Sequence, residues 1–120
     1  MFTNIEIIKK VVNDIFIFAL IWEIDETNAD DTFKIIFDSF YWNKIIYDLS
    51  KMEYCNSKFI WYLVNMNEFI QEKWWKMCIS ITENPVKDTL DLAWVHHFIP
   101  IKDSVEEAIL EINNEIWNIA

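Results

Sequence analysis

The chain has 120 residues, of which 53% are hydrophobic and none is glycine, and its 20 acidic and 10 basic residues give a net charge of −10. The missing glycine excludes a Walker loop, a GxGxxG dinucleotide-binding turn and an EF-hand loop, because each needs that residue for its backbone geometry. The negative charge disfavours direct binding to nucleic acid, which depends on cations at the phosphates.

The first predicted element is a helix from Thr3 to about Trp22. Its apolar stripe consists of Ile8, Val11, Val12, Ile15 and Ala19. This spacing follows the helical period, and the second half of the segment is apolar nearly all round, which predicts a central position in the core. A strand over residues 15–24 is the competing interpretation, because the segment is rich in β-branched residues.

A polar loop and a second helix follow. Residues 23–31, with the sequence EIDETNADD, form the longest polar stretch and are predicted to be a loop. Asn28 or Asp30 would then cap a helix that runs to about Met52. Acidic residues in its first turn suit the positive end of the helix dipole.

Three further helices are predicted in the second half of the chain. Asn56–Ser57 marks the start of a helix over Lys58–Ile79. Asn84–Pro85 has the arrangement of an N-cap followed by proline at the first helical position, and Pro100 would end this shorter helix. Asp103 is predicted to cap the last helix.

Together these elements predict an all-α protein, a compact single-domain bundle of about five helices over residues 1–120. The longest apolar run, Ile15–Trp22, is far shorter than the roughly 20 residues that span a bilayer. The N-terminus also lacks the order of a secretory signal, so a cytoplasmic protein is predicted. Cys55 and Cys78 are interpreted as free, buried thiols.

No combination of residues predicts catalysis, a metal site or a cofactor. His96 and His97 are adjacent, and neighbouring residues of a helix point about 100° apart, so the two cannot readily bind one metal ion. Cys78 lies in an apolar segment rather than the cationic, exposed setting that activates a thiol. We therefore expect a protein that is not an enzyme.

The last predicted helix carries an acidic stripe at successive i+4 positions, made of Asp103, Glu107, Glu111 and Glu115. Like charges at this spacing cost the helix on the order of 1 kcal/mol in total. On a helical wheel Leu110 and Trp117 lie beside the acids and off the core face. An aromatic anchor flanked by charge is typical of a binding surface, although a solvated acidic face has the same pattern.

The candidate partner-binding residues are this stripe with Leu110 and Trp117, together with the loop acids Asp25, Glu26, Asp30 and Asp31. The loop and the last helix would jointly build a negative surface. This predicts a small acidic inhibitor that occludes the basic surface of a nuclease or nucleic-acid-binding partner, in particular a toxin-neutralising immunity protein.

Other functions remain open at this point. A phage anti-defence protein of the anti-CRISPR type would use the same carboxylates to mimic nucleic acid. A helical structural or adaptor module would use its acidity for solubility, and Leu110 and Trp117 could then support self-association. An enzyme or small-molecule binder would need a cavity with convergent polar groups.

Overall fold

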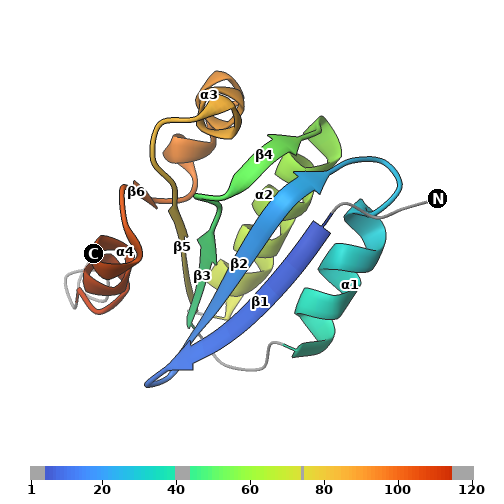
Figure 1. Ribbon diagram of the computed structural model, residues 1–120. Coiled ribbons are helices and arrows are strands. Elements are labelled where there is room, and N and C mark those ends of the chain that lie inside the picture. Colours follow the sequence, from blue (N-terminus) through green and yellow to red (C-terminus); the bar gives the residue numbers. More distant parts are fainter. Residues whose placement is uncertain (1–4, 40–43, 74, 115–120) are drawn as a thin grey trace.

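The computed structural model describes residues 5–39, 44–73 and 75–114. It shows a sheet with helices packed against both faces (Figure 1). The strands are β1 (Ile5–Val12), β2 (Ile15–Ile24), β3 (Lys44–Asp48), β4 (Met52–Cys55), β5 (Lys76–Ser80) and β6 (Ile101–Lys102). The helices are α1 (Ala29–Ser39), α2 (Ser57–Glu72), α3 (Pro85–Leu92) and α4 (Val105–Ile112), with a 3₁₀ turn η1 (Val95–His97).

The sheet is mixed and six-stranded, in the order β1-β2-β3-β5-β6, with β4 paired to the end of β2. β1 and β2 form an antiparallel hairpin in which Val12 lies opposite Ile15 and Ile5 lies opposite Trp22. The pairings β2–β3, β2–β4, β3–β5 and β5–β6 are parallel. Parallel neighbours need crossover connections, which α1, α2 and α3 supply.

Two hydrophobic layers hold the helices to the sheet. On one face Phe16, Phe18 and Leu20 of β2 belong to the larger core, which also includes residues of α1, α2 and α3. On the other face Ile15 and Ile17 belong to a smaller core with α4. Residues 15–18 are therefore buried on both sides of the sheet, which explains why the sequence there is continuously apolar.

The predicted all-α bundle is wrong, and the first predicted helix shows why. Its described part is the hairpin of β1 and β2, so the competing strand over residues 15–24 is the correct interpretation. A run buried on both faces shows no alternation and matches a buried helix equally well. Thr3 lies outside the described residues.

The second and third predicted helices each merge a helix with a strand. α1 ends at Ser39, and the segment predicted to continue it includes β3. α2 ends at Glu72, and the segment predicted to continue it includes β5. In both places apolar residues of a buried strand continue the helical spacing by chance, and no glycine or proline marks the boundary.

The predicted helix starts are more accurate. Asn56 caps α2, and Asn84 caps α3 with Pro85 at its first position, so both predictions are confirmed. The cap of α4 is Ser104 rather than Asp103, because the Ser104 hydroxyl accepts the hydrogen bond from the Glu107 N–H at 3.1 Å. A cap depends on a few neighbouring residues, so it can be predicted from the sequence even where the length of the helix cannot.

Replacing Asn84 with alanine is expected to lower the free energy of unfolding by about 1 kcal/mol, because the side chain accepts a hydrogen bond from the Lys87 N–H at 2.8 Å. Asn65→Ala is the matched control, since Asn65 lies exposed inside α2 and alanine favours a helix interior. Urea unfolding of both variants measures the difference. Equal losses would show that the cap contributes nothing specific.

Candidate functional site

The strands β2, β3, β5 and β6 run in one direction, so their carboxyl ends lie along one edge of the sheet. In open α/β sheets, ligands bind outside this edge. The end of β2, the β3–β4 turn and the first residues of α2 and α3 lie along this edge (Figure 1). We call this the carboxyl-edge surface and define it by Trp22, Ser50, Lys51, Glu53, Tyr54, Ser57 and Asn84.

The N-terminus of α2 is fixed by its cap. The Asn56 side chain accepts a hydrogen bond from the Phe59 N–H at 3.1 Å, and the Asn56 N–H donates to the Ile24 carbonyl at 3.2 Å. Ser57 follows as the first residue of the helix and is exposed. Its hydroxyl therefore lies at the positive end of the helix dipole, where a negatively charged substituent is stabilised.

Short-range hydrogen bonds shape the β3–β4 turn, and one more joins it to the end of β2. The Asp48 carboxylate accepts from the Ser50 N–H at 3.1 Å and from the Ser50 hydroxyl at 2.7 Å. The Lys51 carbonyl accepts from the Trp22 N–H at 3.3 Å, which ties the turn to the end of β2. These contacts give the surface a defined shape.

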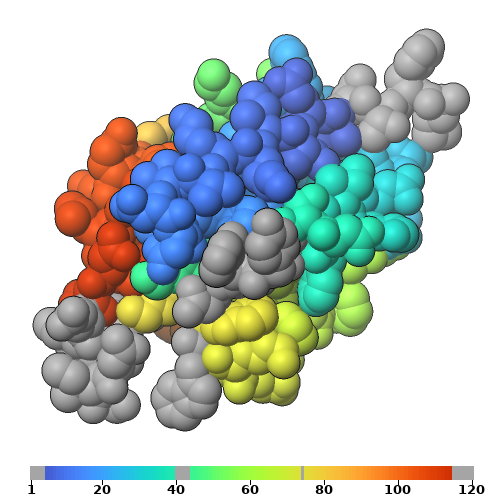
Figure 2. Space-filling model, turned by 90° about the horizontal axis from the view of Figure 1, so that it is seen from below, coloured from blue at the N-terminus to red at the C-terminus, as the bar shows by residue number. Residues whose placement is uncertain are grey.

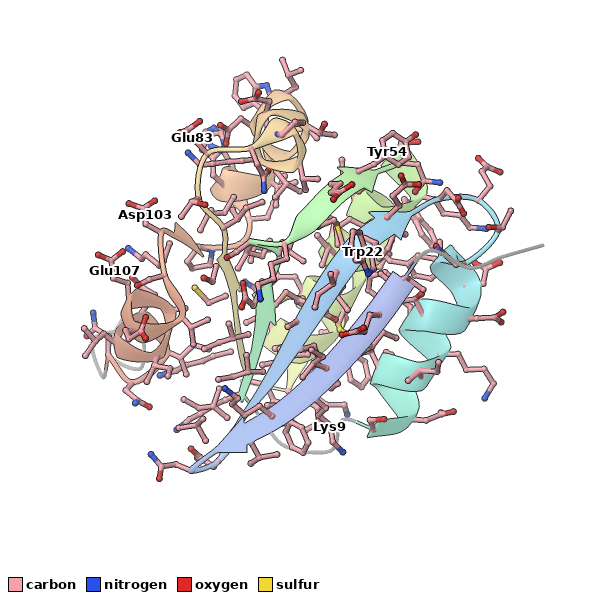
Figure 3. All side chains as sticks on the ribbon, in the orientation of Figure 1. Lys9, Trp22, Tyr54, Glu83, Asp103 and Glu107 are labelled. Carbon is pink, nitrogen blue, oxygen red and sulfur yellow. The ribbon has the colours of Figure 1, made fainter. Side chains whose placement is uncertain are left out.

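Trp22 is the most unusual residue of this surface. It has a φ of 85°, in the left-handed region that disfavours a bulky side chain, and the ladder shifts register between Trp22 and Glu23. Its indole is half exposed, and Figure 3 shows Trp22 and Tyr54 on the strands β2 and β4. Exposed aromatic side chains on strained backbone are features of binding sites.

A shallow hollow of about 680 Å³ opens at this position. Its lining consists of Glu6, Ile21, Trp22, Ser50, Lys51, Met52, Glu53, Asn84 and Pro85. The lining combines apolar and charged side chains, a mixture that suits contact with another protein.

The predicted site residues include none of the carboxyl-edge surface. The sequence did contain a signal for this site. Asn56–Ser57 is a clear helix start, and it directly follows Met52–Cys55, a segment with an apolar residue at each end. Interpreting that segment as a strand would have placed a serine at a strand-to-helix junction, where α/β proteins bind ligands.

The thiols and histidines offer no catalytic arrangement in the part of the chain that the structure describes. Cys55 and Cys78 are free and buried, as predicted. Burial raises the pKa of Cys55 to about 11 and that of Cys78 to about 12, so neither forms a nucleophilic thiolate near neutral pH. His97 is exposed and stacks on Trp94 at 4.7 Å. Residues 5–39, 44–73 and 75–114 contain no cluster of His, Cys, Asp or Glu that could hold a metal ion.

The acids predicted on the last helix have local partners. The Glu107 carboxylate accepts from the Asp103 N–H at 3.3 Å, and Glu111 forms an ion pair with Lys102 at 3.1 Å. Leu110 is 72% exposed, which confirms that it lies off the core face. Glu115 and Trp117 lie outside the described residues, and the role of the stripe in partner binding stays a prediction.

The loop acids lie away from α4, between the end of β2 and the start of α2. Asp30 accepts a hydrogen bond from the Tyr62 hydroxyl and pairs with Lys58 at 3.0 Å, and these two contacts lower its pKa. Asp25 accepts from Thr27, which lowers its pKa as well, while Glu26 and Asp31 are exposed. α4 packs on the opposite face of the sheet from α1, so the structure does not join the two acidic sets into one surface (Figure 1).

Comparison with known proteins agrees with this architecture. The family model of the STAS domain matches residues 6–108, from β1 into α4. The chain belongs to the STAS domain family. No curated protein matches it at the level of sequence.

Solved structures of STAS-like proteins superpose closely on the chain. An anti-sigma factor antagonist from Mycobacterium paratuberculosis has a TM-score of 0.81 at 15% identity, with 92% of this chain and 95% of that chain covered. A Thermotoga maritima protein, provisionally named an anti-sigma factor antagonist, has a TM-score of 0.84 at 26% identity, with 90% and 95% covered. The anti-sigma factor antagonist SpoIIAA, in its unphosphorylated form, has a TM-score of 0.74 at 12% identity, with 89% and 96% covered.

These findings correct the function predicted from the sequence. The predictions of an immunity protein, an anti-CRISPR mimic, a helical adaptor and a nuclease partner are wrong. The chain is a STAS domain with an α/β fold. Acidity is a property of many soluble surfaces and does not specify a basic partner. The similar proteins are named as regulators that antagonise another protein, not for a reaction. Among the described residues, no helix is long and apolar enough to cross a bilayer.

Proposed function

We propose that this STAS domain is an anti-sigma factor antagonist that binds its anti-sigma factor through the carboxyl-edge surface. The observation that carries the proposal is the exposed Ser57 hydroxyl at the N-terminus of α2, on the same surface as the half-exposed rings of Trp22 and Tyr54. The 26% identity to the Thermotoga protein over 90% of this chain supports the same function.

Phosphorylation of Ser57 would control this binding. The name of the SpoIIAA structure distinguishes an unphosphorylated form, and Ser57 is the hydroxyl of the carboxyl-edge surface that lies at a helix N-terminus. A phosphoryl group adds about −1.5 to −2 charges, which the helix dipole stabilises. The same group places new charge and bulk within the contact surface, which weakens binding.

The proposal assigns this domain to binding rather than catalysis. Its buried thiols and its half-exposed aromatic side chains suit a recognition module. An anti-sigma factor acts on transcription, so the proposed partner also implies a cytoplasmic location.

The experiment is a calorimetric binding measurement against the anti-sigma factors encoded in the same genome as this chain. We expect one of them to bind the wild-type domain and the Ser57→Ala variant alike. Ser57→Asp, which mimics the charge of a phosphoryl group, should weaken that complex at least about tenfold, or about 1.4 kcal/mol.

Ser104→Asp is the matched control. It introduces the same charge at another helix N-terminus, where aspartate also serves as a cap, but at the start of α4, outside the residues that define the carboxyl-edge surface. We expect its affinity to equal that of the wild type. Equal weakening by both aspartates would make the effect one of net charge, and the absence of binding to every anti-sigma factor would refute the proposed function.

A further inference from the structure

β1 is the outer strand of the sheet and lies at the molecular surface (dark blue in Figure 2). Among the described residues it pairs with β2 and with no other strand. Ile8 is 44% exposed and Val11 is 48% exposed, although both are apolar. An exposed edge of eight residues with apolar side chains is a template for pairing with another strand.

The hairpin determines which backbone groups of β1 point outward. A two-residue turn closes on a hydrogen-bonded pair, here Val12 and Ile15, and bonded and non-bonded pairs then alternate along the ladder. Trp22 confirms this alternation independently, because its N–H donates to Lys51, away from β1. The outward N–H and C=O groups therefore belong to Ile5, Ile7, Lys9 and Val11.

The side chains of Glu6, Ile8 and Lys10 share one face of the strand, at successive i+2 positions. Glu6 and Lys10 are placed symmetrically about Ile8. A two-fold antiparallel pairing centred on Ile8 thus sets each Glu6 opposite Lys10 of the second copy and sets the two Ile8 side chains opposite each other. It also joins the outward backbone groups of Ile7 and Lys9, as hydrogen bonding requires.

The neighbouring registers that also match the backbone groups lack this complementarity. A pairing centred on Lys9 or on Lys10 sets two lysines opposite each other, which is unfavourable. A pairing centred on Ile7 sets Glu6 opposite Ile8 and leaves the charge unpaired. Residues 5–12 also carry one acid and two lysines, so the repulsion between copies of this strongly acidic chain is locally reduced at β1.

We propose that a second copy of this chain docks on β1, forming a two-fold symmetric dimer with a continuous sheet and two Glu6–Lys10 cross-strand pairs. An isologous contact of this kind is the commonest way in which soluble proteins form dimers. The interface lies along the outer strand, and Glu6 at its start also lines the hollow beside Trp22. Self-association is measured on this chain alone, so the proposal can be tested without the anti-sigma factor.

The test is sedimentation equilibrium of the wild-type chain and of charge-reversed variants at rising protein concentration. We expect the wild type to dimerise and each of Glu6→Lys and Lys10→Glu to raise the dimer dissociation constant at least about tenfold, since each replaces two attractive pairs with two repulsive ones. The double variant Glu6→Lys/Lys10→Glu should dimerise again. An equimolar mixture of the two single variants should form the heterodimer.

Glu68→Lys is the control, because it makes the same charge change at an exposed position of α2. Circular dichroism of each variant establishes that the fold is retained. A wild type that stays monomeric at every concentration would overturn the proposal. Lys9 and Lys10 would then be residues that prevent pairing at the edge of the sheet. A dimer that Glu68→Lys weakens equally, or that the double variant does not restore, would overturn it as well.

Discussion

Raising the pH from 9 to 11 is expected to unfold the protein, because three buried acidic groups keep their protons in the folded state. Burial raises the pKa of Cys55 from 9.0 to about 11 and that of Cys78 to about 12. Burial also raises the pKa of the fully buried Tyr47 far above its ordinary value of 10.0. In the unfolded chain all three groups titrate near their ordinary values.

The direction of the effect follows from proton counting. Above about pH 9 the unfolded chain binds fewer protons than the folded protein, so the free energy of unfolding falls as the pH rises. Each group contributes up to about 1.4 kcal/mol per pH unit between its unfolded and folded pKa values. Near pH 10 the sum is roughly 3 kcal/mol per pH unit, which over two units approaches the whole stability of a small domain.

Urea unfolding at a series of pH values measures this slope. Tyr47→Phe should reduce the slope above pH 10 by up to about 1.4 kcal/mol per pH unit, because one of the three groups is removed. Tyr54→Phe is the matched control, since its ring is half exposed and it lies on the surface of β4. A slope that both variants leave unchanged would show that the buried phenol does not govern alkaline unfolding.

Replacing Phe59 with alanine is expected to lower the free energy of unfolding by about 3–5 kcal/mol. Phe59 is fully buried at the start of α2, and its ring lies 5.6 Å from that of Phe33 on α1. The change therefore opens a cavity where two helices and the sheet meet. The expected loss is a large fraction of the stability of a typical domain, so we expect the variant to be partly unfolded at 37 °C.

Trp61→Ala is the control for this prediction. It removes a larger side chain from the same helix, but Trp61 is 62% exposed, so the expected loss is below about 1 kcal/mol. The measurement is the shift of the urea midpoint at constant m-value. Similar losses in the two variants would contradict the placement of Phe59 in the core.

The sequence allowed the caps to be predicted but not the lengths of the elements that follow them. Asn56 and Asn84 were recognisable because a cap depends on a few neighbouring residues. The ends of α1 and α2 depend on which apolar residues the sheet buries, and that information is not local. β1 was equally hidden, because an edge strand with a partly open face does not alternate cleanly between apolar and polar residues.

The absence of glycine removed the usual marks of a turn. Asn13, Trp22 and Trp94 adopt positive φ values of 57°, 85° and 62°, a region that glycine and, less often, asparagine occupy most readily. A tryptophan in the middle of an apolar run gives no sign that the strand pairing shifts register there. Trp22 belongs to the carboxyl-edge surface, so the site was missed together with the strands.

The parallel pairing of the central strands has a consequence for how fast the chain folds. Phe16 lies beside Ile45 and Ile46 lies beside Cys78, so each central pairing must wait until a whole crossover has been closed into a loop. The β1–β2 hairpin is the local exception and can form within microseconds. We therefore expect the docking of β3 and β5 onto that hairpin to limit the folding rate, and refolding to fall on the slower, millisecond-to-second side of two-state domains.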